Sequence, residues 1–214
     1  MKKLILILLF IPLITNSQNS QPSESLKKNI LELLSKDKKA SDIYQKDYDN
    51  WSFNYYKNIK SKSLRNQNIN NIKYYEPKLE DLYNLKISVS NSLNKILKNE
   101  KILSNEELSS SKKIMDDFYY SWHKAQIKSF ELMFELNTIL NSCDFTHKSK
   151  SPTDPKIFEI TFETQDCLDD YNGVISKFLK VIENENLLKQ RFQKNFANIF
   201  KNLLLIIKEK LPYY

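Results

Sequence analysis

The sequence predicts an all-α protein, an antiparallel bundle of four to five long amphipathic helices. Three observations predict this class. Apolar residues recur every three or four positions through most of the chain, and this spacing places them on one face of a helix. The 214 residues include a single glycine, Gly173, whereas average usage of roughly 7% would supply about 15. A capping box, Ser104 to Glu107, precedes the longest apolar pattern.

The scarcity of glycine also excludes several classes of function. Glycine supplies positive φ angles in tight hairpins and lets the backbone approach a ligand closely. A fold of many β-hairpins is therefore disfavoured. Dinucleotide-binding and P-loop phosphate sites, and the nucleophile elbow of α/β-hydrolases, need several glycines at fixed spacing. A chain with one glycine contains none of these motifs.

The first 17 residues have the pattern of a secretory signal peptide. Lys2 and Lys3 form the charged region, residues 4–14 form an apolar segment, and small residues end at Ser17 before a cleavage site. The apolar segment is too short to cross a bilayer, which needs about 20 residues. We expect an exported protein, periplasmic or secreted, that begins at Gln18 and has no transmembrane helix in its mature chain. An uncleaved interfacial anchor is the alternative interpretation.

Residues 18–25 are polar and predict a flexible lead, and residues 26–214 predict a single helical-bundle domain. The first helix is expected from about 23 to 60, with a break near 37–41 left open. The polar stretch 61–76 predicts a loop or a frayed helix.

Pro77 then suits the first turn of a second helix over about 78–99. Lys86 falls beside the apolar stripe of this helix, where we expect it to reach water.

The third helix is expected over about 105–142, and a loop over 142–156. The helix after this loop starts either near Asp154, before Pro155, or near Thr164. Residues 158–162 alternate apolar and polar side chains, which is the period of a strand. A lone strand would have no partner, so helix or irregular chain is favoured there. From about 165 the helical pattern continues to Pro212.

The two cysteines, Cys143 and Cys167, are expected to form a disulfide, because an even pair in an exported protein is usually bridged. A helix that started at Asp154 would carry Cys167 about 20 Å along its axis. A bridge therefore favours either a helix start near Thr164 or a 143–154 loop that folds back. Two buried free thiols are the alternative.

A metal site would have to use Cys143, His147, Cys167 and Asp170, a spacing that matches no established zinc motif. The sequence predicts no metal and no cofactor. His123 stands among aromatic residues and is interpreted as structural, since the E-x-x-H pairs of di-iron bundles are missing.

We expect no enzyme. The alternative is an enzyme whose carboxylates converge only in three dimensions. The residues that would form such a site are Asp116, Asp117, Glu131 and Glu135.

Charge is unevenly distributed along the chain. Residues 50–75 contain five basic residues, no acidic residue and six aromatic residues. This composition is compatible with single-stranded nucleic acid or glycan, but we interpret the aromatic residues as core, and nucleic acid is not the expected partner. Residues 154–170 are acidic. The final helix is basic and offers a possible anionic-surface contact through Lys189, Arg191, Lys194, Lys201, Lys208 and Lys210.

The leading functional prediction is an exported, non-enzymatic helical-bundle protein that acts by binding or by structure in the cell envelope or outside the cell. Its partner would be an unknown protein or envelope component. The alternative is a peripheral membrane protein, or a binder of an anionic envelope polymer, that uses the basic C-terminal helix.

Overall fold

The computed structural model describes residues 24–99 and 103–199. The predicted signal peptide and most of the predicted flexible lead lie outside these residues. So do three of the six basic residues proposed for an anionic surface, Lys201, Lys208 and Lys210.

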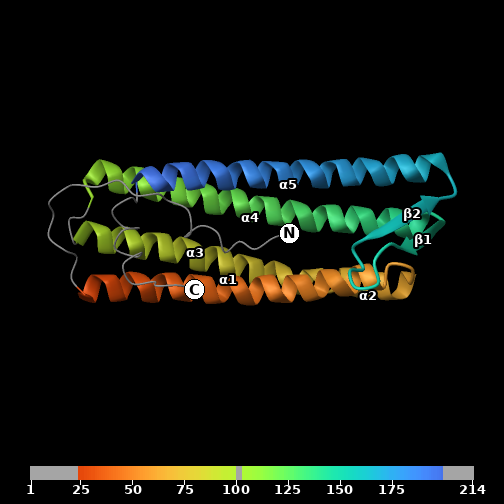
Figure 1. The fold of residues 1–214 in the computed structure, drawn as a ribbon, viewed down its shortest axis with the longest axis horizontal. Coiled ribbons are helices and arrows are strands. Elements are labelled where there is room, and N and C mark those ends of the chain that lie inside the picture. Colours follow the sequence, from red (N-terminus) through yellow and green to blue (C-terminus); the bar gives the residue numbers. More distant parts are fainter. Residues whose placement is uncertain (1–23, 100–102, 200–214) are drawn as a thin grey trace. The chain divides into compact units, whose positions relative to one another are not determined.

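The described chain is mostly α-helical, which confirms the predicted fold class (Figure 1). The helices are α1 (Glu24–Lys57), α2 (Lys62–Asn70), α3 (Ile72–Asn99), α4 (Asn105–Ser142) and α5 (Gln165–Ile199). All but α2 are long. α1 runs without a break through residues 37–41.

Helix α4 has the bounds that the sequence predicts, and its capping box forms. The Ser104 backbone N–H donates to Glu107 Oε2 at 2.8 Å, and the Glu107 N–H donates to Ser104 Oγ at 3.2 Å. These bonds satisfy two of the free donors at the helix start. The hydrogen bond to the carboxylate also lowers the pKa of Glu107.

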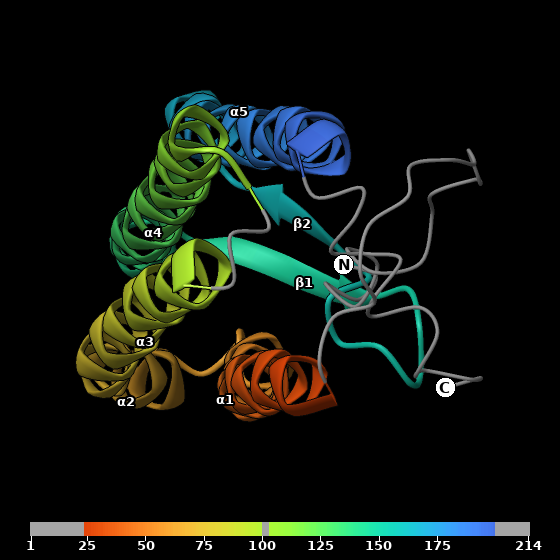
Figure 2. The same cartoon turned by 90° about the vertical axis from the view of Figure 1, so that its left-hand side faces the viewer.

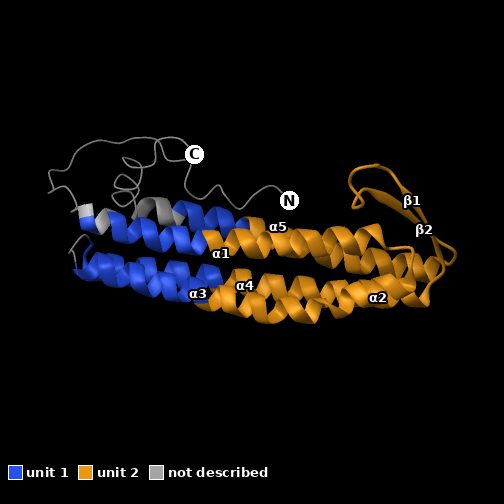
Figure 3. Ribbon diagram, turned by 90° about the horizontal axis from the view of Figure 1, so that it is seen from below, with its two compact units in different colours: residues 1–38, 85–119, 187–214 blue, residues 39–84, 120–186 orange. Residues whose placement is uncertain are grey.

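The chain forms two compact units (Figure 3). Unit 1 comprises residues 1–38, 85–119 and 187–214, and unit 2 comprises residues 39–84 and 120–186. Each of α1, α3, α4 and α5 contributes one segment to each unit. The expectation of a single domain stays a prediction.

Unit 1 has a core to which all four of these helices contribute. Ile30 of α1, Leu93 of α3, Met115 and Phe118 of α4 and Phe192 of α5 are buried together. The rings of Phe118 and Phe192 stack with centroids 4.2 Å apart. The core therefore uses the residues at three- and four-position spacing that predicted the helices.

Lys86 lies inside unit 1 rather than in water, so the expectation for this residue was wrong. Its side chain is only 6% exposed, and its Nζ lies 3.0 Å from Asp37 Oδ1. The same nitrogen lies 5.5 Å from the centroid of the Tyr119 ring. A carboxylate and an aromatic face thus compensate the buried ammonium.

Unit 2 is built around a row of aromatic rings on α1. Tyr44, Tyr48, Trp51 and Tyr55 follow one another with ring centroids 5.6 to 6.4 Å apart. Phe130 of α4 packs 6.1 Å from Tyr48. Burial raises the pKa of Tyr44, Tyr48 and Tyr55 well above the ordinary value, so these rings form a neutral core.

Neighbouring helix segments are antiparallel within each unit. In unit 1, Ser90 hydrogen-bonds Asp116 while Asn94, further along α3, reaches back to Leu108 of α4. In unit 2, α4 and α5 are joined by Glu135 with Lys177, and by Cys143 with Cys167. The higher-numbered residue of α4 meets the lower-numbered residue of α5, as the antiparallel prediction requires.

Residues 62–70 and 72–76 are helical, so of the two alternatives predicted for residues 61–76, a loop or a frayed helix, the loop is wrong. Ser61 Oγ caps α2 by accepting from the Leu64 N–H at 3.4 Å. Asn66 Oδ1 accepts from the side chains of Asn137 at 3.0 Å and Asn141 at 2.6 Å, both on α4. These distant partners stabilise a polar segment whose own sequence does not predict a stable helix.

Pro77 lies inside α3 rather than in its first turn. A proline there removes the hydrogen bond to the carbonyl four residues earlier, that of Lys73. Both residues are exposed, so water can reach this carbonyl and the helix continues.

The alternating segment after the 142–156 region is a strand, and the preference for helix or irregular chain was wrong. Strand β2 (Phe158–Phe162) pairs antiparallel with β1 (Phe145–Ser149), from Phe145 opposite Phe162 to Ser149 opposite Phe158. This hairpin lies across one end of the helices of unit 2 (Figure 2). Helix α5 then starts at Gln165, which decides between the two predicted starts in favour of Thr164.

Candidate functional site

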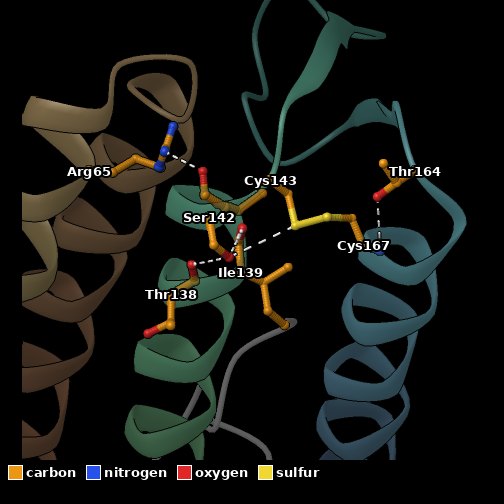
Figure 4. Close-up of a disulfide and its surroundings, with 8 residues drawn as sticks. Arg65, Thr138, Ile139, Ser142, Cys143, Thr164 and Cys167 are labelled. Atoms are coloured by element: carbon orange, nitrogen blue, oxygen red, sulfur yellow. Dashed lines mark hydrogen bonds between the residues drawn. A yellow bond between two sulfur atoms is a disulfide. The ribbon is translucent and has the colours of Figure 1, made fainter.

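A disulfide between Cys143 and Cys167 joins the end of α4 to the first turn of α5 (Figure 4). The two Cα atoms are 6.0 Å apart. Thr164 Oγ1 accepts from the Cys167 backbone N–H at 3.4 Å and so caps the start of α5. This geometry confirms that a bridge and a helix start near Thr164 belong together.

The disulfide leaves no thiolate for the metal alternative. That alternative would use Cys143, His147, Cys167 and Asp170 as zinc ligands. The sulfur atoms of the two cysteines are bonded to each other and cannot serve as thiolate ligands. Within residues 24–99 and 103–199, no group of three or more metal-ligating side chains gathers.

Arg65 of α2 ties the hairpin end of unit 2 together. This side chain is 2% exposed and donates to the carbonyls of Ile59 and, at 2.7 Å, Leu140, and to Asn141 Oδ1 at 2.8 Å. Its guanidinium carbon lies 5.4 Å from the ring centroid of Phe145 on β1. Arg65 therefore serves the fold, and it is withdrawn from any surface that the basic stretch presents.

His147 faces the helices from β1 and contacts the ring of Phe158 at 5.1 Å. Both ring nitrogens are buried without a hydrogen-bond partner among the described residues. Burial, and then the charge of Lys60, lower the pKa of His147. The imidazole is thus held neutral in an aromatic setting, where Phe158 also packs on Tyr56.

A groove on unit 2 is lined by carboxamide and aromatic side chains, and we call it the asparagine–tyrosine groove. Its lining is Asn50, Trp51, Asn54, Asn68, Asn71, Tyr74 and Tyr75, and its volume is about 410 Å³. Ligand sites usually have about 300–1,000 Å³. The aromatic residues of this stretch were visible as a feature of the sequence, whereas the asparagines gave no signal of a site.

The aromatic part of this groove is held in place by specific contacts. Trp51 is buried and its indole Nε1–H donates to the Asn68 backbone carbonyl at 2.8 Å. The Tyr74 and Tyr75 rings meet edge to face, 5.7 Å apart. Lys78 Nζ lies 4.4 Å from the Tyr74 centroid and pairs with Asp47 at 2.7 Å.

A second groove lies between α4 and α5 of unit 2, with a volume of about 400 Å³. Its lining is Glu135, Thr138, Ile139, Asp169, Asp170, Gly173, Val174 and Lys177. Lys177 pairs with Glu135 at 2.5 Å, and Asp169 accepts from Gln165 at 2.7 Å. The charged groups are thus partly paired with one another.

The four carboxylates of the enzyme alternative belong to different units: Asp116 and Asp117 to unit 1, Glu131 and Glu135 to unit 2. Asp116 accepts from Ser90 at 2.8 Å and pairs with Lys112. Glu131 pairs with Lys128 at 2.6 Å. Three of the four therefore have ordinary structural partners, counting the Glu135–Lys177 pair.

His123 packs on α3. Its ring stacks on Tyr83 at 4.5 Å. Its Nε2 lies 3.0 Å from Glu80 Oε2, but the two atoms are not aligned as a hydrogen bond.

The described part of the basic C-terminal segment contributes to the core of unit 1. Phe192 is buried, whereas Arg191 and Lys194 are exposed and Lys189 is half-buried. The apolar side of this segment therefore packs against Phe118, and its charges face outward. In the ranges that the structure covers, no helix has both the length and the apolar character needed to span a bilayer.

Comparison of the chain with protein-family models, with curated proteins and with solved structures finds no match.

Proposed function

We propose that this chain is an exported protein that acts by binding, without catalysis, in the cell envelope or outside the cell. The observation that carries the proposal is the disulfide at the hairpin end of unit 2. Structural disulfides persist in oxidising compartments and are rare in the cytosol. The leader pattern of residues 1–17 points to the same compartments.

The contacts of the titratable side chains favour binding over catalysis. The buried titratable groups of unit 2, such as Tyr44, Tyr55 and Arg65, form or tie together the core. Of the carboxylates named for an enzyme, Asp116, Glu131 and Glu135 have structural partners. The asparagine–tyrosine groove, in contrast, offers neutral recognition groups at the surface.

The proposal is tested by expressing the full chain with its own leader in a bacterial host and fractionating the cells. We expect the protein outside the cytoplasm with Gln18 as its first residue. A control that carries Glu in place of both Lys2 and Lys3 should be exported less efficiently, because the charged region is part of the leader. Retention of the unaltered chain in the cytoplasm, unprocessed, would contradict the proposal.

A further inference from the structure

The asparagine–tyrosine groove has a lining that matches one chemical class of ligand. We propose that it binds a neutral saccharide segment of an envelope or extracellular glycan. The inference rests on the proposed binding function and names its ligand class. It is carried by three observations, which concern the aromatic side chains, the carboxamides and the placement of charge.

The aromatic side chains present a prepared apolar surface. Tyr74 is 64% exposed although Lys78 holds its ring from α3 and Tyr75 packs against its edge. Tyr75 in turn lies 6.2 Å from the buried Trp51. A sugar ring has a face of C–H groups that packs on the electron-rich face of an aromatic ring. Rings already held in place lose little conformational entropy when such a ligand binds.

The carboxamides supply the polar half of the recognition. Each asparagine side chain offers both a carbonyl acceptor and an NH₂ donor, and each sugar hydroxyl is also both donor and acceptor. Asn50, Asn54 and Asn71 are exposed at the groove. Asn68 Nδ2 is buried and has no hydrogen-bond partner among the described residues. Asn68 lines the groove, and a rotation of its side chain would bring this donor to a ligand oxygen.

The placement of charge favours a saccharide over a nucleic acid. No charged residue lines the groove, whereas single-stranded nucleic acid needs a cationic surface that follows its phosphates. Of the cations near the groove, Arg65 is buried against carbonyl groups, Lys62 donates to the Asn141 carbonyl at 3.2 Å, and Lys78 is paired with Asp47. Lys57, Lys60 and Lys73 are exposed, but they do not line the groove. The groove itself is therefore neutral.

The experiment measures binding of two neutral probes, a tetramer of β-linked N-acetylglucosamine and a tetramer of β-linked glucose, to the exported full-length protein by isothermal titration calorimetry. We expect at least one tetramer to bind. Tyr74→Ala should weaken binding about tenfold, because stacking on one aromatic ring is lost. Asn54→Ala should weaken it by about fivefold through loss of a hydrogen bond.

Matched controls come from the same chain. Tyr120 is 48% exposed and carries Lys124 over its ring at 4.6 Å, the same arrangement as Tyr74 with Lys78 but on α4 and outside the groove. Tyr120→Ala should leave the affinity unchanged. Asn91 is an exposed asparagine on α3. Asn91→Ala is the control for Asn54→Ala and should also leave the affinity unchanged. Circular dichroism of each variant checks that the helices are intact.

Three outcomes would overturn the inference. The first is that neither tetramer binds the unaltered protein. The second is that Tyr74→Ala and Tyr120→Ala reduce binding equally. The third is that a labelled deoxythymidine oligomer binds in a Tyr74-dependent way and more tightly than either saccharide. The proposed function is judged separately by the export experiment, so a processed, exported chain that binds no saccharide would refute only the inference.

Discussion

Removal of the disulfide is the perturbation whose effect follows most directly from the structure. The bridge between Cys143 and Cys167 closes the segment that contains the whole β-hairpin, and it fixes the start of α5 beside the end of α4. The double variant Cys143→Ser, Cys167→Ser keeps side chains of similar size and leaves the hairpin pairing to hold this end alone.

The magnitude follows from the length of the closed loop. The two cysteines are 24 positions apart. In the chain-entropy description, closing a loop of this length lowers the entropy of the unfolded chain, and this raises its free energy by about 3.4 kcal/mol at 25 °C. The variant should therefore be less stable than the oxidised protein by about 3 kcal/mol.

The assay is urea unfolding followed by far-ultraviolet circular dichroism, with and without a reductant. Reduction of the unaltered protein should lower its free energy of unfolding to that of the double variant, whereas reductant should not affect the variant. A double variant within about 0.5 kcal/mol of the oxidised protein would refute the loop argument, as would an equal effect of reductant on both proteins.

Three further predictions concern single residues. Gly173→Ala should stabilise the protein by about 0.5–1 kcal/mol in urea unfolding, because a Cβ there meets no atom within 4 Å and alanine favours the helix; a loss of stability would contradict this. Asp37→Asn should cost about 3 kcal/mol by removing the carboxylate that lies 3.0 Å from the buried Lys86, whereas Glu32→Gln in the exposed pair with Lys28 should change little; equal effects would contradict a stabilising pair between Asp37 and Lys86. Because burial and Lys60 lower the pKa of His147 in the folded state, the unfolded chain binds more protons below about pH 6.5, and the melting temperature should fall as the pH drops from 7.5 to 5. His147→Phe should flatten this decline relative to the unaltered protein, and an unchanged slope would exclude His147 as its source.

The local signals in the sequence were sufficient for the long helices. The stripe and capping box predict α4 with its observed bounds, because both are formed by residues close in sequence. The spacing of the two cysteines reduced the alternatives to a helix start near Thr164 or a 143–154 loop that folds back, because the rise of a helix fixes how far Cys167 lies from its start. The structure has the start near Thr164.

The wrong predictions concern segments whose structure depends on residues that are distant in the sequence. Residues 158–162 showed a strand period, but the partner Phe145–Ser149 was hidden in a segment interpreted as loop. The alternation of Phe145 and His147 with polar residues was the available signal. α2 depends on the bonds from Asn66 to α4, about 70 positions away.

The candidate site was predictable only in part. Trp51, Tyr74 and Tyr75 were noted as aromatic residues within a basic stretch. The asparagines of the groove were assigned to the first helix or to the predicted loop. The formation of α2 over Lys62–Asn70, with Asn71 as its C-cap, is what places Asn68 and Asn71 beside Trp51. The basic surface of the same stretch is formed by lysines alone, because Arg65 turns into the core.

The most direct test of the account is mass spectrometry of the protein recovered from its native compartment, alkylated and digested without reduction. The account predicts a single cross-linked species that joins the peptides of Cys143 and Cys167, with neither cysteine alkylated. Two separate alkylated peptides would contradict it, because the protein would then reside where thiols stay reduced and the hairpin end of unit 2 would lack its covalent link.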